Sequence, residues 1–231
     1  MAGVDESLVF HPLNIAVLTV SDTRVEDTDA SGRLLAERLT GAGHKLAAKA
    51  IVHDNVDAIR ERVRAWADDP AIDLILSTGG TGFAPRDVTP EAIRPLVTRE
   101  MDGFSVLVHQ ASFGTVGLST LQSRAFAGQI DDTFVFCLPG STGACPDGWD
   151  LVLAAELDSR YRPCSLAGLI PRLRHLVSSA SSHILMRAAV RGWSTYPARM
   201  QPHVLPLPRG RSPAPPRPWS GSVREQRQKD R

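Results

Sequence analysis

Short apolar runs alternate with amphipathic segments along most of the chain. Residues 14–20 read NIAVLTV, a run rich in β-branched residues that is typical of a strand buried on both faces. Similar runs predict strands at residues 45–52, 73–77 and 133–138. Segments with helical spacing occupy residues 31–43, 56–67, 103–112, 118–128 and 152–157, and a further helix starts at Thr89. Strands that alternate with helices predict an α/β fold, a three-layer α/β/α sandwich around a mostly parallel sheet.

Two of the predicted helices carry recognisable start signals. Ser31 precedes the apolar positions of the first helix and is the predicted N-cap, with Gly41 or Gly43 as the terminator. Thr89 is the predicted N-cap of a later helix, with Pro90 at its first position.

Composition changes abruptly after Leu173. Residues 1–173 hold 15 Lys+Arg and 23 Asp+Glu, a net charge of −8, whereas residues 174–231 hold 11 and 2, a net charge of +9, together with 8 of the 17 prolines. We therefore divide the chain into a domain at residues 10–173 and a basic Pro/Arg/Ser-rich extension at residues 174–231. The extension offers little apolar surface to bury, so its composition favours disorder. Binding of nucleic acid or of an aromatic-lined groove is the weaker alternative, for which Trp219 gives little support, and no nucleic-acid partner is expected.

Cysteine usage and hydropathy indicate the compartment. The three cysteines, Cys137, Cys145 and Cys164, are odd in number and lack the spacing of a disulfide framework or a zinc site. No stretch approaches the length of a membrane span, and the first residues lack the basic region of a secretory signal. We expect a soluble cytoplasmic protein without a membrane partner.

The stretch STGGTGFAPRDVTPEA, at residues 77–92, follows a predicted buried strand and leads into a helix. Ligands of open α/β sheets bind beyond the carboxyl ends of the strands, which is where this stretch must lie. Gly79, Gly80 and Gly82 leave room for backbone N–H groups to face an anion, and the following helix start adds further donors. The glycines alone fit a phosphate site and a tight turn equally well.

Asp87 favours the phosphate site. A carboxylate beside bound phosphate is repulsive unless a cation lies between them, so the pairing suggests Mg²⁺. The alternative is an acid that stabilises the helix start or pairs with Arg86.

Combined with TREMDGF, LQSR and CLPGS, this stretch resembles the MoaB/MogA family of molybdenum cofactor biosynthesis proteins, the molybdopterin adenylyltransferases. The resemblance covers roughly residues 10–168 and leaves the extension unexplained. It implies a three-layer α/β fold assembled into homo-trimers or hexamers. It also implies Mg-ATP-dependent transfer of AMP onto the terminal phosphate of molybdopterin, with release of pyrophosphate.

The resemblance also assigns roles to residues. Asp87 and Asp54, in IVHDN, match the two essential acids, which would act in catalysis and hold Mg²⁺, and Ser123, in LQSR, matches a serine that contacts the substrate phosphate. The remaining residues expected to line the nucleotide and pterin pocket are Ser21, Asp22, Gly79, Gly80, Thr81, Gly82, Pro139, Gly140 and Ser141.

A second function stays open. The chain could be a catalytically weak molybdopterin-binding carrier or assembly protein of the MoaB branch, which keeps the fold and the pocket. The intact Arg86-Asp87 pair together with Asp54 favours the enzyme.

Overall fold

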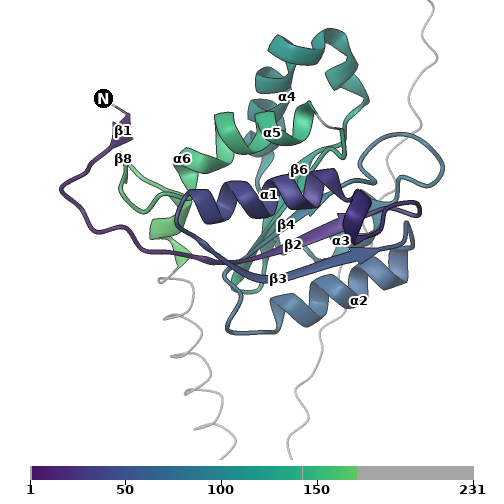
Figure 1. Cartoon of the computed structure of the whole chain (residues 1–231), viewed down its shortest axis with the longest axis horizontal. Helices are drawn as coiled ribbons and strands as arrows, with labels where there is room; N and C mark the ends of the chain where they lie inside the picture. Colours follow the sequence, from purple (N-terminus) through teal and green to yellow (C-terminus); the bar gives the residue numbers. More distant parts are fainter. Residues whose placement is uncertain (1, 142, 171–231) are drawn as a thin grey trace, which may run out of the picture. The chain divides into compact units, whose positions relative to one another are not determined.

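The computed structural model describes residues 2–141 and 143–170, so the predicted extension at 174–231 lies outside the described residues. Their centre is a six-stranded sheet in the order β3-β2-β4-β7-β6-β5 (Figure 1). The strands are β2 (Asn14–Val20), β3 (Lys45–Val52), β4 (Leu74–Thr78), β5 (Arg99–Glu100), β6 (Phe126–Ile130) and β7 (Thr133–Leu138). β3, β2, β4 and β7 are parallel neighbours, and β6 and β5 join antiparallel. The mostly parallel α/β sheet expected from the sequence is confirmed.

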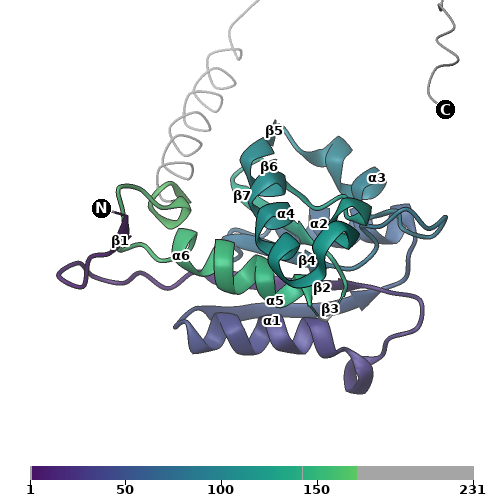
Figure 2. The ribbon, with the colours of Figure 1, turned by 90° about the horizontal axis from the view of Figure 1, so that it is seen from above.

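Helices cover both faces of the sheet (Figure 1). They are α1 (Ala30–Gly41), α2 (Val56–Ala67), α3 (Thr89–Ile93), α4 (Asp102–Val116), α5 (Ala144–Gly148) and α6 (Ala154–Glu156). Shorter helical turns are η1 (Glu26–Thr28), η2 (Arg94–Leu96), η3 (Gly117–Gln122), the π-helical η4 (Trp149–Leu153) and η5 (Leu166–Gly168). The two-residue strands β1 (Gly3–Val4) and β8 (Tyr161–Arg162) pair near α6, far from α3 (Figure 2).

Alternation along the strands builds two hydrophobic cores. Ile15 and Val17 of β2 pack with α1, α4, α5 and η4, for example against Leu35. Ala16 and Leu18 face the other way and pack with α2 and α3, for example against Ile59. Because β2 is buried on both faces, it reads as a continuous apolar run rather than an alternating one. None of the described helices is both long and apolar enough to cross a membrane.

Two predicted helix starts were wrong. The N-cap of α1 is Asp29, whose carboxylate accepts a hydrogen bond from the Gly32 N–H at 2.9 Å, and Ser31 lies inside the helix. The residue that precedes α3 is Val88, so Thr89 is the first helical residue and its hydroxyl bonds elsewhere. In both cases the observed helix starts one or two positions earlier than the predicted cap indicates, and Val88, unlike Asp29, makes no side-chain capping bond.

The helix predicted at 118–128 was also wrong beyond its first turn. Residues 117–122 form the 3₁₀ turn η3, and residues 126–130 form β6, which pairs with β7 through a two-residue hairpin at Asp131 and Asp132. Asp131 has a φ of +50°, the left-handed conformation that such short hairpin loops require.

Candidate functional site

The carboxyl ends of β2, β3, β4 and β7 meet at one edge of the sheet. In register, Val20 lies opposite Val52, and Thr78 lies opposite Leu138. The strand order reverses direction between β2 and β4, since β3 lies to one side of β2 and β4 to the other. Open α/β sheets bind ligands at such a switch point. The loops that leave these strands carry most of the residues singled out from the sequence.

The turn after β4 needs its glycines. Gly79 has a φ of +100°, and a Cβ there would lie 2.3 Å from the carbonyl oxygen of Val20. Gly140, in the loop after β7, approaches so closely that its own Cβ would lie 2.9 Å from the Gly79 Cα. Thr89 fixes the turn from the other side, because its hydroxyl donates to the Gly79 carbonyl at 2.8 Å and its N–H donates to the Gly80 carbonyl at 3.0 Å.

These loops enclose a pocket of about 360 Å³. Its described lining is Gly80, Thr81, Gly82, Asp87, Val116, Ser119, Thr120, Gln122, Ser123, Pro139, Gly140, Ser141 and Ala144. No partner for the backbone N–H groups of Gly80, Thr81 and Gly82 is found among the described residues. Successive unpaired backbone N–H groups that line a concavity are the elements of an anion site.

Two carboxylates flank the same turn. A Cβ on Gly80 would lie 3.1 Å from Asp54 Oδ1, and a Cβ on Gly82 would lie 2.6 Å from Asp87 Oδ2. Asp87 Oδ2 accepts a hydrogen bond from the Ala84 N–H at 2.8 Å, which closes the loop between the glycines and α3. The sequence prediction that Asp54 and Asp87 come from different loops to one place agrees with this geometry.

Asp22 connects the loops after β2 and β3. Its N–H donates to Asp54 Oδ2 and its Oδ1 accepts from the Asp54 N–H, both at 3.0 Å. Arg86 Nη1 lies 3.3 Å from Asp22 Oδ2, and His53 Nδ1 lies 3.5 Å from Asp22 Oδ1. Burial raises the pKa of Asp54, the charges of Asp22 and Asp87 raise it further, and the Asp22 N–H and Arg86 oppose them.

The clustered negative charges of Asp22, Asp54 and Asp87 would favour a bound cation. A carboxylate whose pKa is raised by its neighbours' negative charge is stabilised when a cation joins the group. Within the described part of the chain, no group of three or more His, Cys, Asp or Glu side chains is arranged to hold a metal ion. Mg²⁺ is commonly held by only one or two carboxylates, with water and substrate phosphates as its other ligands. Asp54 and Asp87 are the residues that could hold Mg²⁺ in this way.

Ser123, the residue directly after η3, lines the pocket. Its hydroxyl accepts a hydrogen bond from the Ala125 N–H at 3.2 Å, and no acceptor for the hydroxyl proton is found among the described residues. His109 Nε2, in α4, lies 3.1 Å from the Ser123 carbonyl oxygen.

Sequence reasoning missed the structural role of Arg124. Its Nε donates to the Gly82 carbonyl at 2.8 Å and its Nη2 donates to the Asp87 carbonyl at 2.6 Å, while Nη1 pairs with the Glu91 carboxylate. Its guanidinium also lies 5.3 Å from the Phe83 ring centroid. Arg124 thereby holds both ends of the loop that carries Asp87. The sequence signal was present, since Arg124 follows Ser123 directly, but its partners lie in a loop that is distant along the chain.

Of the twelve predicted site residues, eight line the pocket: Gly80, Thr81, Gly82, Asp87, Ser123, Pro139, Gly140 and Ser141. Asp54, Asp22, Ser21 and Gly79 lie behind or beside this lining. Ser21 N–H donates to the Val52 carbonyl at 2.9 Å, which joins the ends of β2 and β3.

Comparison with known proteins agrees with this geometry. Residues 16–159 match the protein family described as "Probable molybdopterin binding domain". The chain belongs to this family. Molybdenum cofactor biosynthesis protein B of Escherichia coli is 46% identical over 159 residues, which cover 69% of this chain and 94% of that protein. The Bacillus subtilis protein of the same name is 44% identical over 142 residues, 61% of this chain and 84% of its own length.

Solved structures of this molybdopterin-binding family have the same fold. A crystal structure of molybdenum cofactor biosynthesis protein B has a TM-score of 0.65 at 36% identity, over 71% of this chain and 98% of that one. The molybdopterin biosynthesis enzyme MoaB of Thermus thermophilus has a TM-score of 0.56, also at 36% identity, over 61% and 89% of the two chains. The resemblance to MoaB and MogA inferred from the sequence motifs is confirmed.

Proposed function

We propose that this chain catalyses the Mg-ATP-dependent adenylylation of molybdopterin and releases pyrophosphate. The observation that carries the proposal is the convergence of Asp54 and Asp87 on a turn whose Gly80, Thr81 and Gly82 N–H groups have no partner among the described residues. An anion site beside two carboxylates suits a phosphate together with a cation.

The chemistry asks little covalent work of the protein. Adenylyl transfer requires the attacking phosphate to be aligned with the α-phosphorus and the negative charge to be neutralised as it grows. Mg²⁺ held by Asp54 and Asp87 would supply charge neutralisation. The backbone N–H groups of residues 80–82 would orient a phosphate, and the Ser123 hydroxyl would donate to a second one.

Pyrophosphate release tests the proposal directly. Purified protein incubated with molybdopterin and Mg-ATP should release pyrophosphate, and Asp87→Asn should lower the rate by roughly 10²-fold, the scale of losing one strong electrostatic contact at a transition state. The variant should fold and bind molybdopterin, because asparagine keeps the oxygen that accepts from the Ala84 N–H.

Two results would contradict this assignment. Full turnover by Asp87→Asn with a stability loss of about 1 kcal/mol or less would make Asp87 an acid of the helix start only. Tight molybdopterin binding by the wild type with no pyrophosphate release would support the carrier or assembly role instead.

A further inference from the structure

The pocket is electrostatically one-sided. Asp87 lines one wall, with Asp54 and Asp22 behind it, and none of its described lining residues is Lys, Arg or His. Pro139, Gly140 and Ser141, in the loop after β7, form another wall. The N–H groups of Gly140 and Ser141 have no partner among the described residues. A phosphate on that wall would therefore need a cation from just outside the lining.

Arg24 supplies a cation beside that wall. It lies half-buried in the loop between β2 and α1, and its Nη1 donates to the Ser31 hydroxyl at 3.3 Å. Ser31 in turn donates to the Gly140 carbonyl at 3.2 Å. The Arg24 charge also acts on Cys145, the second residue of α5: burial raises the pKa of that thiol to about 11 and Arg24 opposes the rise. Both observations place the guanidinium next to the Pro139–Ser141 wall.

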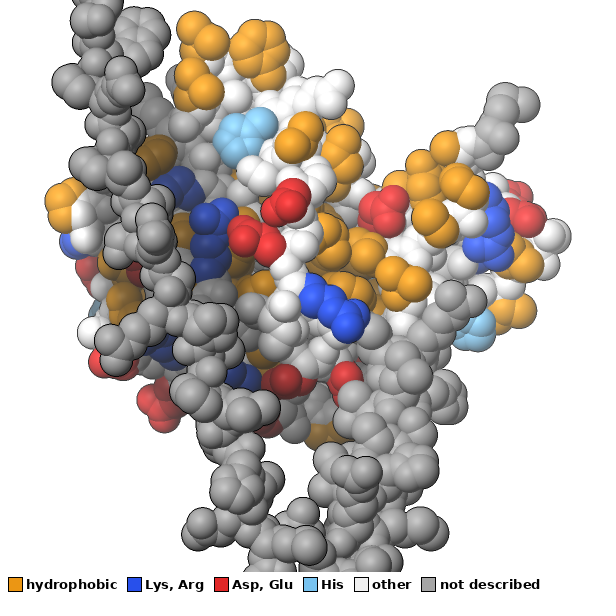
Figure 3. Space-filling view, turned by 180° about the vertical axis from the view of Figure 1, so that it is seen from behind, with side chains coloured by type: hydrophobic (Ala, Val, Ile, Leu, Met, Phe, Trp, Pro, Cys, Tyr) orange, Lys and Arg blue, Asp and Glu red, His pale blue; other side chains and the backbone are white. Residues whose placement is uncertain are grey.

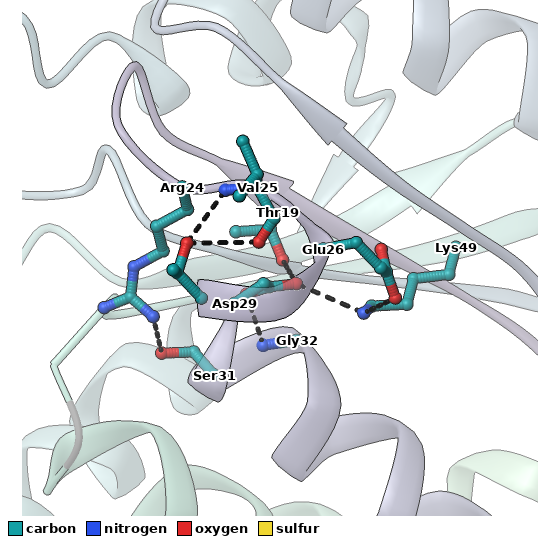
Figure 4. Close-up of polar contacts among 9 residues, drawn as sticks. Thr19, Arg24, Val25, Glu26, Asp29, Ser31, Gly32 and Lys49 are labelled. Carbon is teal, nitrogen blue, oxygen red and sulfur yellow. Dashed lines mark hydrogen bonds and ion pairs between the residues drawn. The ribbon is translucent and has the colours of Figure 1, made fainter.

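A buried network fixes this loop (Figure 4). Asp29 is fully buried, and its carboxylate accepts from the Thr19 hydroxyl and from the Gly32 N–H, both at 2.9 Å. Lys49 Nζ, in β3, lies 3.4 Å from Asp29 Oδ2 and 2.6 Å from Glu26 Oε1, so Lys49 forms an ion pair with the buried Asp29 carboxylate. The network ties β2, β3 and the start of α1 together.

Arg24 forms no ion pair with the carboxylates of this network. In Figure 4 its guanidinium points away from Asp29 and Lys49, toward Ser31. Ser31 is the one side-chain partner found for it among the described residues. Within the described part of the chain, most of its N–H donors therefore have no protein partner and could serve a ligand.

We propose that Arg24 binds a phosphate group of the pocket's ligand, seated on the Gly140–Ser141 wall. The planar guanidinium offers paired donors that match phosphate oxygens. The part of the pocket beside Asp54 and Asp87 thus suits a phosphate together with a cation. The Gly140–Ser141 wall suits a phosphate whose charge is neutralised by Arg24. The inference rests on the proposed function only in taking the ligands to be phosphate-bearing, as ATP and molybdopterin are.

Binding measurements on the full-length chain without Mg²⁺ test this role and identify the ligand. Wild type, Arg24→Gln, Arg24→Lys and Arg33→Gln are titrated separately with ATP and with molybdopterin. Arg33 is the matched control, because it is exposed on α1 and no side-chain partner is found for it among the described residues. Melting curves confirm that each variant is folded.

Arg24→Gln should weaken binding of one of the two ligands about tenfold, the loss of one charge-assisted contact. The ligand that is affected identifies which phosphate lies on this wall. Arg24→Lys should recover part of the affinity by restoring the charge without the planar fork. Arg33→Gln should stay within about twofold of the wild type, because exposed charges are screened by solvent.

The outcomes separate this proposal from the adenylylation itself. Wild-type affinity of Arg24→Gln for both ligands overturns the role of Arg24, even if pyrophosphate is released. An equal loss in Arg33→Gln also overturns it, because the effect would then be one of net charge. If Arg24→Gln weakens one ligand but the wild type releases no pyrophosphate, the anion site stands and the adenylylation fails. Binding of neither ligand by the wild type overturns both.

Discussion

Asp54 lies where ionisation is costly to the folded chain. Burial and the charges of Asp22 and Asp87 disfavour its negative form, and the opposing Asp22 N–H and Arg86 do not cancel them. Functional groups are commonly held in such unfavourable environments, and replacing them then increases stability.

We therefore expect Asp54→Asn to raise the melting temperature at pH 7 in Mg²⁺-free buffer. The amide removes the like-charge repulsion and keeps an oxygen that can accept from the Asp22 N–H. Millimolar Mg²⁺ with ATP should raise the melting temperature of the wild type more than that of the variant, by mass action on the metal site. Calorimetry measures both shifts. A lower melting temperature of the variant in Mg²⁺-free buffer would show that the carboxylate is structural.

His44 gives the fold a pH dependence that is separate from the site. It is buried between Phe10 and Trp149, and its Nδ1 accepts from the Leu13 N–H at 3.2 Å. Burial lowers its pKa below the usual 6.5, against the charge of Asp158. A lowered pKa means that the unfolded chain takes up the proton first, so stability falls as the pH drops from about 6.5 toward the folded-state pKa.

His44→Gln should flatten that part of the stability profile. The glutamine oxygen can accept from the Leu13 N–H but takes up no proton in this range. Denaturant unfolding at pH 7.5, 6.5 and 5.5 should show the wild type losing more free energy of unfolding than the variant. Parallel curves for the two proteins would remove His44 as the cause.

At the scale of elements, the loop between β4 and α3 depends on one side chain from another segment. Arg124 donates to the Gly82 and Asp87 carbonyls and pairs with Glu91. Its side chain is 23% exposed and that of Glu91 is 53% exposed, so the carbonyl contacts should contribute more than the ion pair.

Arg124→Lys should lower the free energy of unfolding by about 1–3 kcal/mol, because an ammonium cannot reach both carbonyls at once. It should also speed hydrogen exchange at the Ala84 and Asp87 amides, whose bonds close the loop. Glu91→Gln is the control, since it removes only the ion pair and should cost no more than about 1 kcal/mol. Equal losses in the two variants would assign the effect to the ion pair.

Sequence patterns predicted most of the strands of the sheet. The strands at 14–20, 45–52 and 133–138 were placed at their observed bounds. β2 and β7 are buried on both faces and are therefore almost entirely apolar, whereas β3 lies at the edge of the sheet and is only partly buried. β6 was missed because FAGQI is short and contains Gly128, and glycine is uncommon in strands.

The candidate site residues that lie within short sequence motifs were predicted. Asp54, Asp87, the glycines and Ser123 are read from local stretches, and a recognisable family arrangement connects them. The roles of Arg24, Thr89 and Arg124 depend on which loops meet in three dimensions. Thr89 illustrates this: a threonine before Pro90 favours an N-cap, but its hydroxyl is drawn to the Gly79 carbonyl, which no local pattern brings close.

At the scale of the whole molecule, apolar side chains reach the surface over α4 and η3. Val106, Leu107, Phe113, Leu118 and Leu121 are between 49% and 73% exposed. Figure 3 shows hydrophobic side chains gathered in groups on one face of the molecule. Exposed apolar surface of this kind favours association, as the family resemblance also predicts.

We expect a symmetric oligomer, a trimer or a hexamer, that buries this surface. Leu118→Asp should reduce the mass measured by light scattering at micromolar concentration, because a buried carboxylate without a partner opposes association. Leu151→Asp, at a leucine of η4 that is 64% exposed, is the control and should leave the mass unchanged. A monomeric wild type would refute the assembly. Since η3 also lines the pocket, Leu118→Asp should weaken ligand binding as well.

The close approach of Gly79 and Gly140 restricts how this pocket can diversify. A side chain on Gly140 would collide with the Gly79 backbone, and a side chain on Gly79 would collide with the Val20 carbonyl. Both glycines are therefore constrained by the backbone, and substitutions that alter ligand preference must occur in neighbouring pocket residues, in η3 and at Ser141. A library of variants that randomises those neighbouring positions preserves the packing of the loops after β4 and β7. In a library that also randomises the two glycines, most variants would disrupt that packing.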